Sequence, residues 1–267
     1  MSTTMVRHGM KVSAQWRPVA CSLFLLAGSP IEAQAGGIMD VDVQAYRNCV
    51  APSPLARIKA AIGWQTLTPN PDKAVPVPTA SSFSSFNTTV TPGSKAPLRS
   101  TLEACVPAKL GDVLAFYRTE LGKLGWQEKP DGAVIAADQA QLAFTVPEGS
   151  AVLKLGRKNG NTSVSLVQKN SEAATKANVM PKPGQAALVF ANSGDNEAEL
   201  TINEQTITIA YRRQHALRLD LPPGEYSYEL RVPDHPTRTD TLTLAVGDAW
   251  ELTVGRDGAV QSPFHLY

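Results

Sequence analysis

The chain has 267 residues, of which 43% are hydrophobic and 18% charged, a composition typical of globular proteins. Its 25 lysines and arginines balance 24 aspartates and glutamates, so no strongly basic surface of the kind that binds nucleic acid is expected. The length favours two domains of modest size.

Residues 1–35 have the three parts of a secretory signal peptide. A basic stretch holds Arg7, Lys11 and Arg17, and the apolar run "VACSLFLLAG" follows at Val19–Gly28. The small-residue triplet Ala33–Ala35 then predicts cleavage between Ala35 and Gly36. The apolar run is too short to cross a bilayer, which needs about 20 residues. We therefore expect a periplasmic or extracellular protein with no transmembrane segment once the signal is removed.

Two cysteines, Cys49 and Cys105, remain after such cleavage. An isolated pair in an oxidising compartment favours a disulfide over two free thiols. Neither cysteine belongs to a C-x-x-C motif or has a neighbouring histidine, as a metal site or a nucleophile would require. The predicted role of this pair is structural.

The N-terminal segment, residues 36–73, contains a possible short helix around Pro54–Ile62. The stretch Thr68–Lys95 is dense in proline, serine and threonine. Such a composition buries little apolar surface, so we expect a loop or an extended arm there.

Residues 74–170 predict a module with one main helix and several strands. The alternation in Leu98–Val106 indicates a half-buried strand, and a stripe of apolar residues from Leu110 to Leu124 indicates a helix directly after it. Further strands are expected in the segments Gln141–Pro147, Ala151–Arg157 and Thr162–Gln168, and Asn159-Gly160 predicts a hairpin between the last two.

The stretch "FYRTELGKLGW", Phe116–Trp126, is interpreted as the end of that helix. Gly125 falls where a left-handed residue ends a helix, and Trp126 is placed to pack back on Leu121. Gly122, inside the helix, suggests a close approach of the helix to a sheet. The stretch, together with a following hairpin and a preceding "PVP" segment at Val75–Pro78, resembles a module of uncharacterised secreted bacterial proteins. The resemblance covers residues 74–170 and implies no reaction.

Residues 171–184 show no periodicity and predict a linker, whereas residues 185–267 predict a small β-sandwich. Strands are expected at Ala186–Ala191, Ala198–Ile202, Thr206–Tyr211, Ala216–Leu221, Glu225–Val232, Asp240–Val246 and Trp250–Val254. The segments "LTIN", "LPPGEY", "AVGDAW" and "LTV" resemble PEGA or carboxypeptidase-regulatory domains, which implies a spacer or recognition module. The whole chain is thus predicted to be α+β, with an N-terminal antiparallel sheet and one main helix followed by a small all-β sandwich.

Candidate chemistry in the sequence is sparse. "PDHP", Pro233–Pro236, places His235 beside an aspartate and near Asp240, but flanking prolines favour an exposed turn over a metal site. No nucleophile elbow, phosphate-binding loop or H-E-x-x-H motif is present in the sequence, so no catalytic, cofactor or metal residue is assigned.

These patterns predict an exported, non-catalytic binding or structural module whose partner is another envelope or extracellular protein. The alternative is an enzyme or small-ligand receptor with a site assembled between the two domains from Tyr117, Arg118, His235 and Asp240. A third interpretation is a structural part of a larger assembly, with Pro263–Tyr267 as a docking tail.

Overall fold

The structure is a computed structural model that describes Cys49 and residues 67–91, 95–210 and 213–267. The predicted signal peptide, its cleavage site at Ala35 and Gly36, and the possible helix at Pro54–Ile62 lie outside these residues. Within the described ranges, no helix combines the length and the apolar character that crossing a bilayer requires.

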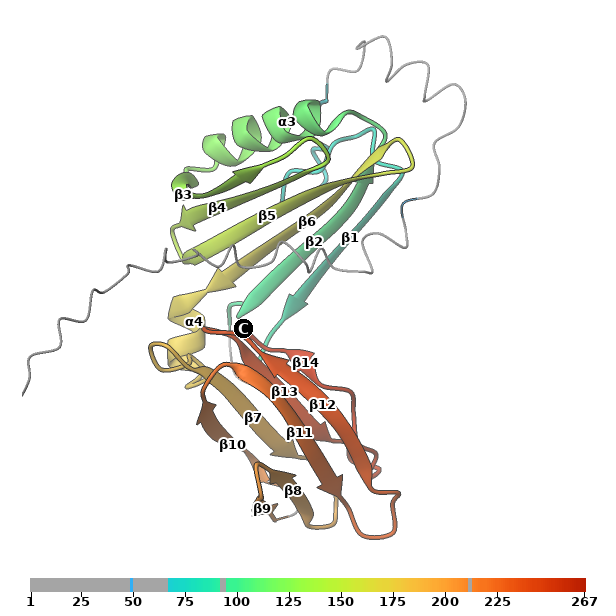
Figure 1. The fold of residues 1–267 in the computed structure, drawn as a ribbon, viewed down its shortest axis with the longest axis vertical. Helices are drawn as coiled ribbons and strands as arrows, with labels where there is room; N and C mark the ends of the chain where they lie inside the picture. The colour runs from blue at the N-terminus through green and yellow to red at the C-terminus, as the bar shows by residue number, and fades with distance from the viewer. Residues whose placement is uncertain (1–48, 50–66, 92–94, 211–212) are drawn as a thin grey trace, which may run out of the picture. The chain divides into compact units, whose positions relative to one another are not determined.

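The first half of the described chain is a six-stranded antiparallel sheet with the order β1-β2-β6-β5-β4-β3 (Figure 1). Its strands are β1 (Phe83–Thr89), β2 (Arg99–Val106), β3 (Gln127–Ile135), β4 (Gln139–Val146), β5 (Gly149–Lys158) and β6 (Asn161–Asn170). One helix, α3 (Leu110–Lys123), packs its buried stripe on one face of this sheet. This arrangement of mostly strands and few helices agrees with the predicted α+β class.

Helix α3 packs through the apolar stripe described above. Leu121 and Tyr117 are fully buried, in one hydrophobic cluster with sheet residues such as Leu142 and Leu153. The helix ends with Leu124 as its C-cap. The N–H of Trp126 then donates to the carbonyl of Leu121 at 3.1 Å.

Gly125 completes this helix end. Its N–H donates to the carbonyl of Gly122 at 3.0 Å, and its φ of 78° lies in the left-handed region that glycine adopts without steric cost. These two hydrogen bonds define a Schellman motif. The Trp126 ring packs edge-on against Phe144, with the ring centroids 6.0 Å apart.

The expected reason for Gly122 is wrong. A Cβ atom built on this residue meets nothing within 4 Å, and the residue is exposed. Gly122 follows the buried Leu121 by one position, which turns it about 100° around the helix axis and away from the sheet. No contact in the structure explains a glycine at this position.

Strand β1 lies inside the stretch that was expected to be a loop or an extended arm. All seven of its residues pair with β2, from Phe83 opposite Cys105 to Thr89 opposite Arg99. Its serines, threonines and asparagine resemble a loop composition, but pairing with a buried neighbour strand outweighs the weak local preference.

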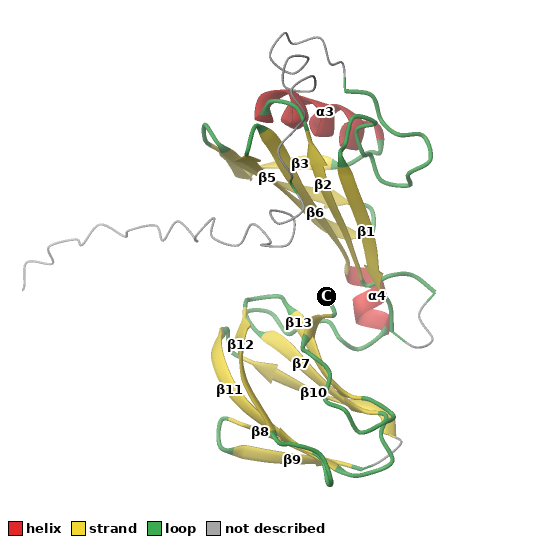
Figure 2. Ribbon diagram, turned by 90° about the vertical axis from the view of Figure 1, so that its right-hand side faces the viewer, coloured by secondary structure: helices red, strands yellow, loops and turns green. Residues whose placement is uncertain are grey.

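The second half of the described chain forms two four-stranded sheets, with the orders β10-β7-β13-β14 and β12-β11-β8-β9 (Figure 2). Their strands are β7 (Ala186–Asn192), β8 (Ala198–Ile202), β9 (Gln205–Ile209), β10 (Arg213–Leu221), β11 (Gly224–Arg231), β12 (Arg238–Leu244), β13 (Ala249–Val254) and β14 (Phe264–His265). Side chains of both sheets share one hydrophobic cluster, in which Phe190 and Leu252 come from the first sheet and Leu230 comes from the second.

A further hydrophobic cluster contains residues from both halves. A short helix, α4 (Ser171–Lys176), occupies part of the stretch predicted to be a linker, and the Asn170 side chain caps it by accepting from the N–H of Ala173 at 2.8 Å. Ala174 of this helix, Leu98, Val189 of β7 and Leu266 are buried in the same cluster. The stretch is therefore a packed connection with helical structure.

The predicted disulfide joins Cys49 to Cys105, whose Cα atoms are 5.3 Å apart. Cys105 lies on β2 and is fully buried. The bridge spans 56 positions of the chain and attaches Cys49 to strand β2 of the six-stranded sheet.

Candidate functional site

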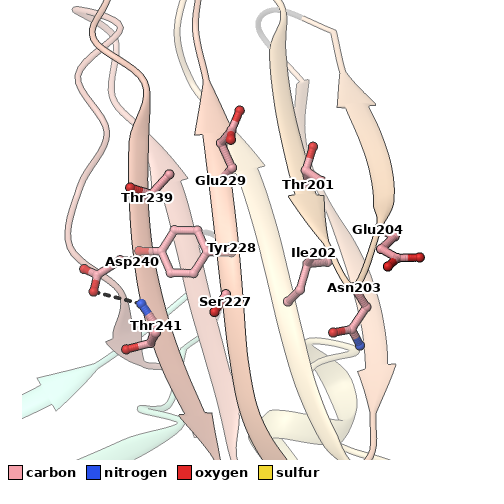
Figure 3. Close-up of a pocket in the computed structure, with 10 residues that line it drawn as sticks. All are labelled: Thr201, Ile202, Asn203, Glu204, Ser227, Tyr228, Glu229, Thr239, Asp240 and Thr241. Carbon is pink, nitrogen blue, oxygen red and sulfur yellow. Dashed lines mark hydrogen bonds between the residues drawn. The ribbon is translucent and has the colours of Figure 1, made fainter.

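A surface hollow lies on the outer face of the sheet β12-β11-β8-β9. This threonine groove has a volume of about 430 Å³ (Figure 3). It is lined by Thr201, Ile202, Asn203, Glu204, Ser227, Tyr228, Glu229, Thr239, Asp240 and Thr241. Three strands and one turn therefore contribute to a single site.

Strand alternation explains why polar side chains meet in the groove. On β11, Tyr228 and Leu230 point into the core, so Ser227 and Glu229 between them face outward. The register then places Glu229 between Thr201 of β8 and Thr239 of β12. The result is a row in which the carboxylate of Glu229 lies between the hydroxyl groups of Thr201 and Thr239.

The turn from β8 to β9 forms the rim of the groove. Asn203 and Glu204 have φ angles of 48° and 62°, the left-handed values of a tight two-residue hairpin turn. Because β8 ends at this turn while β11 continues, Ser227 has no partner on β8. The space left beside Ser227 is part of the groove.

Two of the three acidic side chains of the groove, Glu229 and Asp240, are paired with arginines of their own strands. Asp240 accepts from the backbone N–H of Thr241 at 2.9 Å and from Nη2 of Arg238 at 3.2 Å. These two interactions lower the pKa of Asp240 below its ordinary value, so it is ionised at neutral pH. Glu229 likewise pairs with the guanidinium of Arg231.

This arrangement is suited to hydrogen bonding. The hydroxyls of Thr201, Ser227 and Thr239 can both donate and accept, whereas an ionised Asp240 only accepts. A carboxylate whose pKa is lowered is a poor proton donor, so Asp240 does not have the properties of a general acid. The groove therefore offers hydrogen-bonding groups to a ligand.

The predicted interdomain residues occupy different environments. Tyr117 is fully buried in the core beneath α3, and burial raises the pKa of its phenol, which keeps the hydroxyl protonated. Arg118 makes a bidentate pair with Glu128, through Nε at 2.9 Å and Nη2 at 2.7 Å.

The other two predicted residues belong to the second half of the chain. Asp240 lines the threonine groove, and His235 lines a neighbouring open hollow of about 490 Å³, which shares Thr239 with the groove. Neither hollow includes Tyr117 or Arg118 among its lining residues. An interdomain site made of these four side chains stays a prediction.

The "PDHP" segment forms a turn. Asp234 has a φ of 63°, and the N–H of His235 donates to the carbonyl of Val232 at 3.2 Å. Over the described residues, no group of three or more His, Cys, Asp or Glu side chains is placed to hold a metal ion.

Sequence reasoning missed a charged cluster around Asp248. Lys169 on β6 places Nζ 2.9 Å from Oδ1 of Asp248, and Nε2 of His265 lies 3.4 Å from Oδ2. The His265 ring also packs on Trp250, with the centroids 3.7 Å apart. These residues come from distant parts of the chain, so no local motif connects them.

The environment of Asp248 has opposing effects on its carboxyl group. Burial on its own raises the pKa of Asp248, but the interactions with His265 and Lys169 outweigh burial and hold the pKa at about 2. The cluster is therefore a partly buried ion pair at neutral pH.

No protein-family model matches this chain, and the search of curated proteins finds no match. The resemblances to secreted bacterial proteins and to PEGA or carboxypeptidase-regulatory domains accordingly stay predictions.

Proposed function

We propose that the protein is an exported, non-catalytic binding module of the cell envelope or extracellular space, which holds a protein partner in the threonine groove. The observation that carries this proposal is the lining of the groove, where hydroxyl groups lie beside Glu229 and Asp240, two carboxylates already paired with arginines. Such groups form many hydrogen bonds without an activated nucleophile or proton donor.

Two further features support the proposal. The Cys49–Cys105 disulfide is suited to an oxidising compartment, and the predicted signal peptide would deliver the chain to one. The two facing sheets of the second half resemble extracytoplasmic β-sandwiches of the recognition type.

The partner is sought by affinity capture from the envelope and extracellular fractions of the native host. We expect Thr239→Arg to abolish retention of a partner that the unchanged protein holds, because a long cation on β12 fills the open groove and alters its hydrogen bonding. The matched control is Thr208→Arg, since Thr208 is exposed on the neighbouring edge strand β9 but does not line the groove.

An assay for enzymatic activity tests whether the protein is non-catalytic. The purified protein is tested with a panel of generic hydrolase substrates, and its metal content is measured. Turnover that one point substitution abolishes would contradict the proposal. Equal loss of the partner with Thr239→Arg and Thr208→Arg would exclude the groove as its site.

A further inference from the structure

Most edge strands in the described part of the chain carry features that prevent pairing with another strand. Such features include charges, proline, bulges and shortness. Strand β3 contains Lys129, Pro130 and Asp131, and its register with β4 shifts after Lys129. Strand β12 contains Arg238 and Asp240, β10 has a register shift, β9 has five residues and β14 has two.

Strand β1 has none of these features. Its sequence, "FSSFNTT", contains no charged residue and no proline over seven residues, and its register with β2 is regular throughout. Within the described residues, β1 pairs only with β2, so its other side presents unpaired backbone N–H and C=O groups. This edge can accept another strand.

An apolar side chain stands at the centre of this edge. Phe86 is the middle residue of β1 and is 45% exposed, and Val90 just beyond the strand is 57% exposed. Phe86 also borders a pocket of about 230 Å³, which has Val75, Val77 and Leu102 in its lining. The edge therefore combines hydrogen-bonding backbone with an apolar centre.

We propose that β1 pairs antiparallel with β1 of a second copy of this chain, about a twofold axis that passes beside Phe86. In this register Phe86 lies opposite the partner's Phe86, and Phe83 lies opposite the partner's Thr89. The two six-stranded sheets become one continuous sheet, with both α3 helices on the same face because the twofold axis is perpendicular to the sheet.

Self-complementarity distinguishes a second copy from a foreign strand. The twofold axis brings the central residue opposite its own equivalent and pairs every other residue of β1 with a residue of the same strand sequence, so a charged strand would risk placing like charges together, and β1 carries none. The central residue meets itself, and an aromatic pair across two strands is a favourable contact.

The same geometry limits the assembly to two copies. Pairing uses the β1 edge of both chains and leaves only the two β3 edges at the ends of the joined sheet. These edges are protected by Pro130, by charges and by the register shift. Closed dimers, with no further addition of strands, are therefore expected.

The test is the mass of the purified, oxidised protein, measured by sedimentation equilibrium over a range of micromolar concentrations. The unchanged protein is expected to be a dimer. Phe86→Lys and Phe86→Glu each place like charges at the axis and remove the aromatic pair, so the dimer dissociation constant should rise at least tenfold, roughly. An equimolar mixture of the two variants should restore the dimer, because opposite charges then meet at the axis.

The matched control is Ile135→Lys, which changes a residue of similar exposure, 53%, on the opposite edge strand β3. It should leave the dimer intact. Far-UV circular dichroism of each variant verifies folding, and recovery in the mixture shows that both Phe86 variants remain competent to pair.

Three results would overturn the inference: a monomeric unchanged protein, a dimer that Phe86→Lys leaves intact, or a mixture of the two Phe86 variants that stays monomeric. A monomer that instead binds an extended peptide along β1 would assign the edge to a foreign strand.

The inference goes beyond the proposed function and does not depend on it, because the threonine groove lies on a different sheet and its capture experiment leaves β1 unchanged.

Discussion

Asp248 shows how one residue can stabilise contacts between distant segments. Its side chain is only 17% exposed, and it interacts with Lys169, from 79 positions earlier in the chain, and with His265. A buried carboxylate without partners would be costly, so the interactions with Lys169 and His265 are what make an ionised Asp248 tolerable at this site.

The first prediction concerns the pH dependence of stability at this residue. The pKa of Asp248 falls from 3.8 to about 2 on folding, so its contribution is present above about pH 4 and is lost as the pH falls toward 2. The shift corresponds to roughly 2 kcal/mol. Asp248→Asn should therefore lower the free energy of unfolding by roughly that amount at pH 7 and by much less at pH 2, as measured by urea denaturation at both values.

Glu172→Gln is the matched control for that experiment. Glu172 pairs with Lys176 on the exposed surface of α4, where water screens the interaction. This change should leave the pH dependence as it is. An Asp248→Asn variant whose loss of stability is the same at pH 7 and pH 2 would disprove the role assigned to the carboxylate.

At the scale of elements, the sequence predicted best where a local pattern and a tertiary contact agree. The α3 stripe is an example, because the residues at helical spacing, such as Val113 and Leu121, are those that the sheet buries. The apolar alternation of β5 and β11 is likewise repeated in their burial patterns. Strand β1 could not be predicted in this way, because its regular structure comes from pairing with β2 rather than from its own composition.

Two glycines near the C-terminal end of α3, one inside the helix and one just beyond it, provide the second prediction. Neither Gly122 nor Gly125 would bring an added Cβ within 4 Å of another residue, so backbone conformation alone distinguishes them. Gly125→Ala forces a side chain into the left-handed region at φ 78° and should cost about 1–2 kcal/mol. Gly122→Ala should stabilise the protein by about 1 kcal/mol, because alanine is the better helix former.

Chemical denaturation of the two alanine variants and of the unchanged protein measures both effects. Each variant is the control for the other, since they differ by only three positions. Shifts of the same sign in both variants would contradict the assignment of opposite backbone effects to Gly122 and Gly125.

For the whole molecule, the most informative signal in the sequence was a continuous run of apolar residues, without alternation of apolar and polar positions. "AALVF", Ala186–Phe190, is buried at every position: Leu188 and Phe190 belong to the core between the two four-stranded sheets, and Val189 belongs to the cluster with Leu98 and Leu266. A continuous apolar run is typical of a strand covered on both faces. This pattern could have revealed a hydrophobic cluster on the second face of β7, but it could not identify Leu98 and Leu266 as members of that cluster, because they are distant in sequence.

The composition of the threonine groove was also beyond sequence reasoning. Asp240 was singled out in the sequence because of a nearby histidine, whereas its structural neighbours are Thr241 and Arg238. Alternation predicts which side chains of a strand face outward, but the order of strands across a sheet decides which of them meet.

The third prediction tests whether the hydrophobic cluster that contains Leu98, Val189 and Leu266 couples the two halves of the chain. Leu266 is 1% exposed in this cluster, so Leu266→Ala should lower the free energy of unfolding by about 2–5 kcal/mol. Because the cluster contains residues of both halves, weakening it should also divide a single calorimetric unfolding transition into two. Phe264→Ala is the control, since Phe264 lies on β14 only two positions before Leu266 but is 37% exposed.

A calorimetric trace in which Leu266→Ala and Phe264→Ala lower the transition temperature equally would contradict the coupling. So would a large loss of stability with one undivided transition.

The parallel pairing of β7 with β13 affects the order in which this protein can be completed during synthesis. Leu188 lies beside Trp250 and Phe190 beside Leu252, although about sixty positions separate these strands in the chain. A ribosome that has just released β7 has therefore not yet made the strand that belongs next to it. Until β13 emerges, one of the most apolar segments of the nascent chain has to remain unpaired on that side, at the stage when a growing polypeptide is most exposed to premature association.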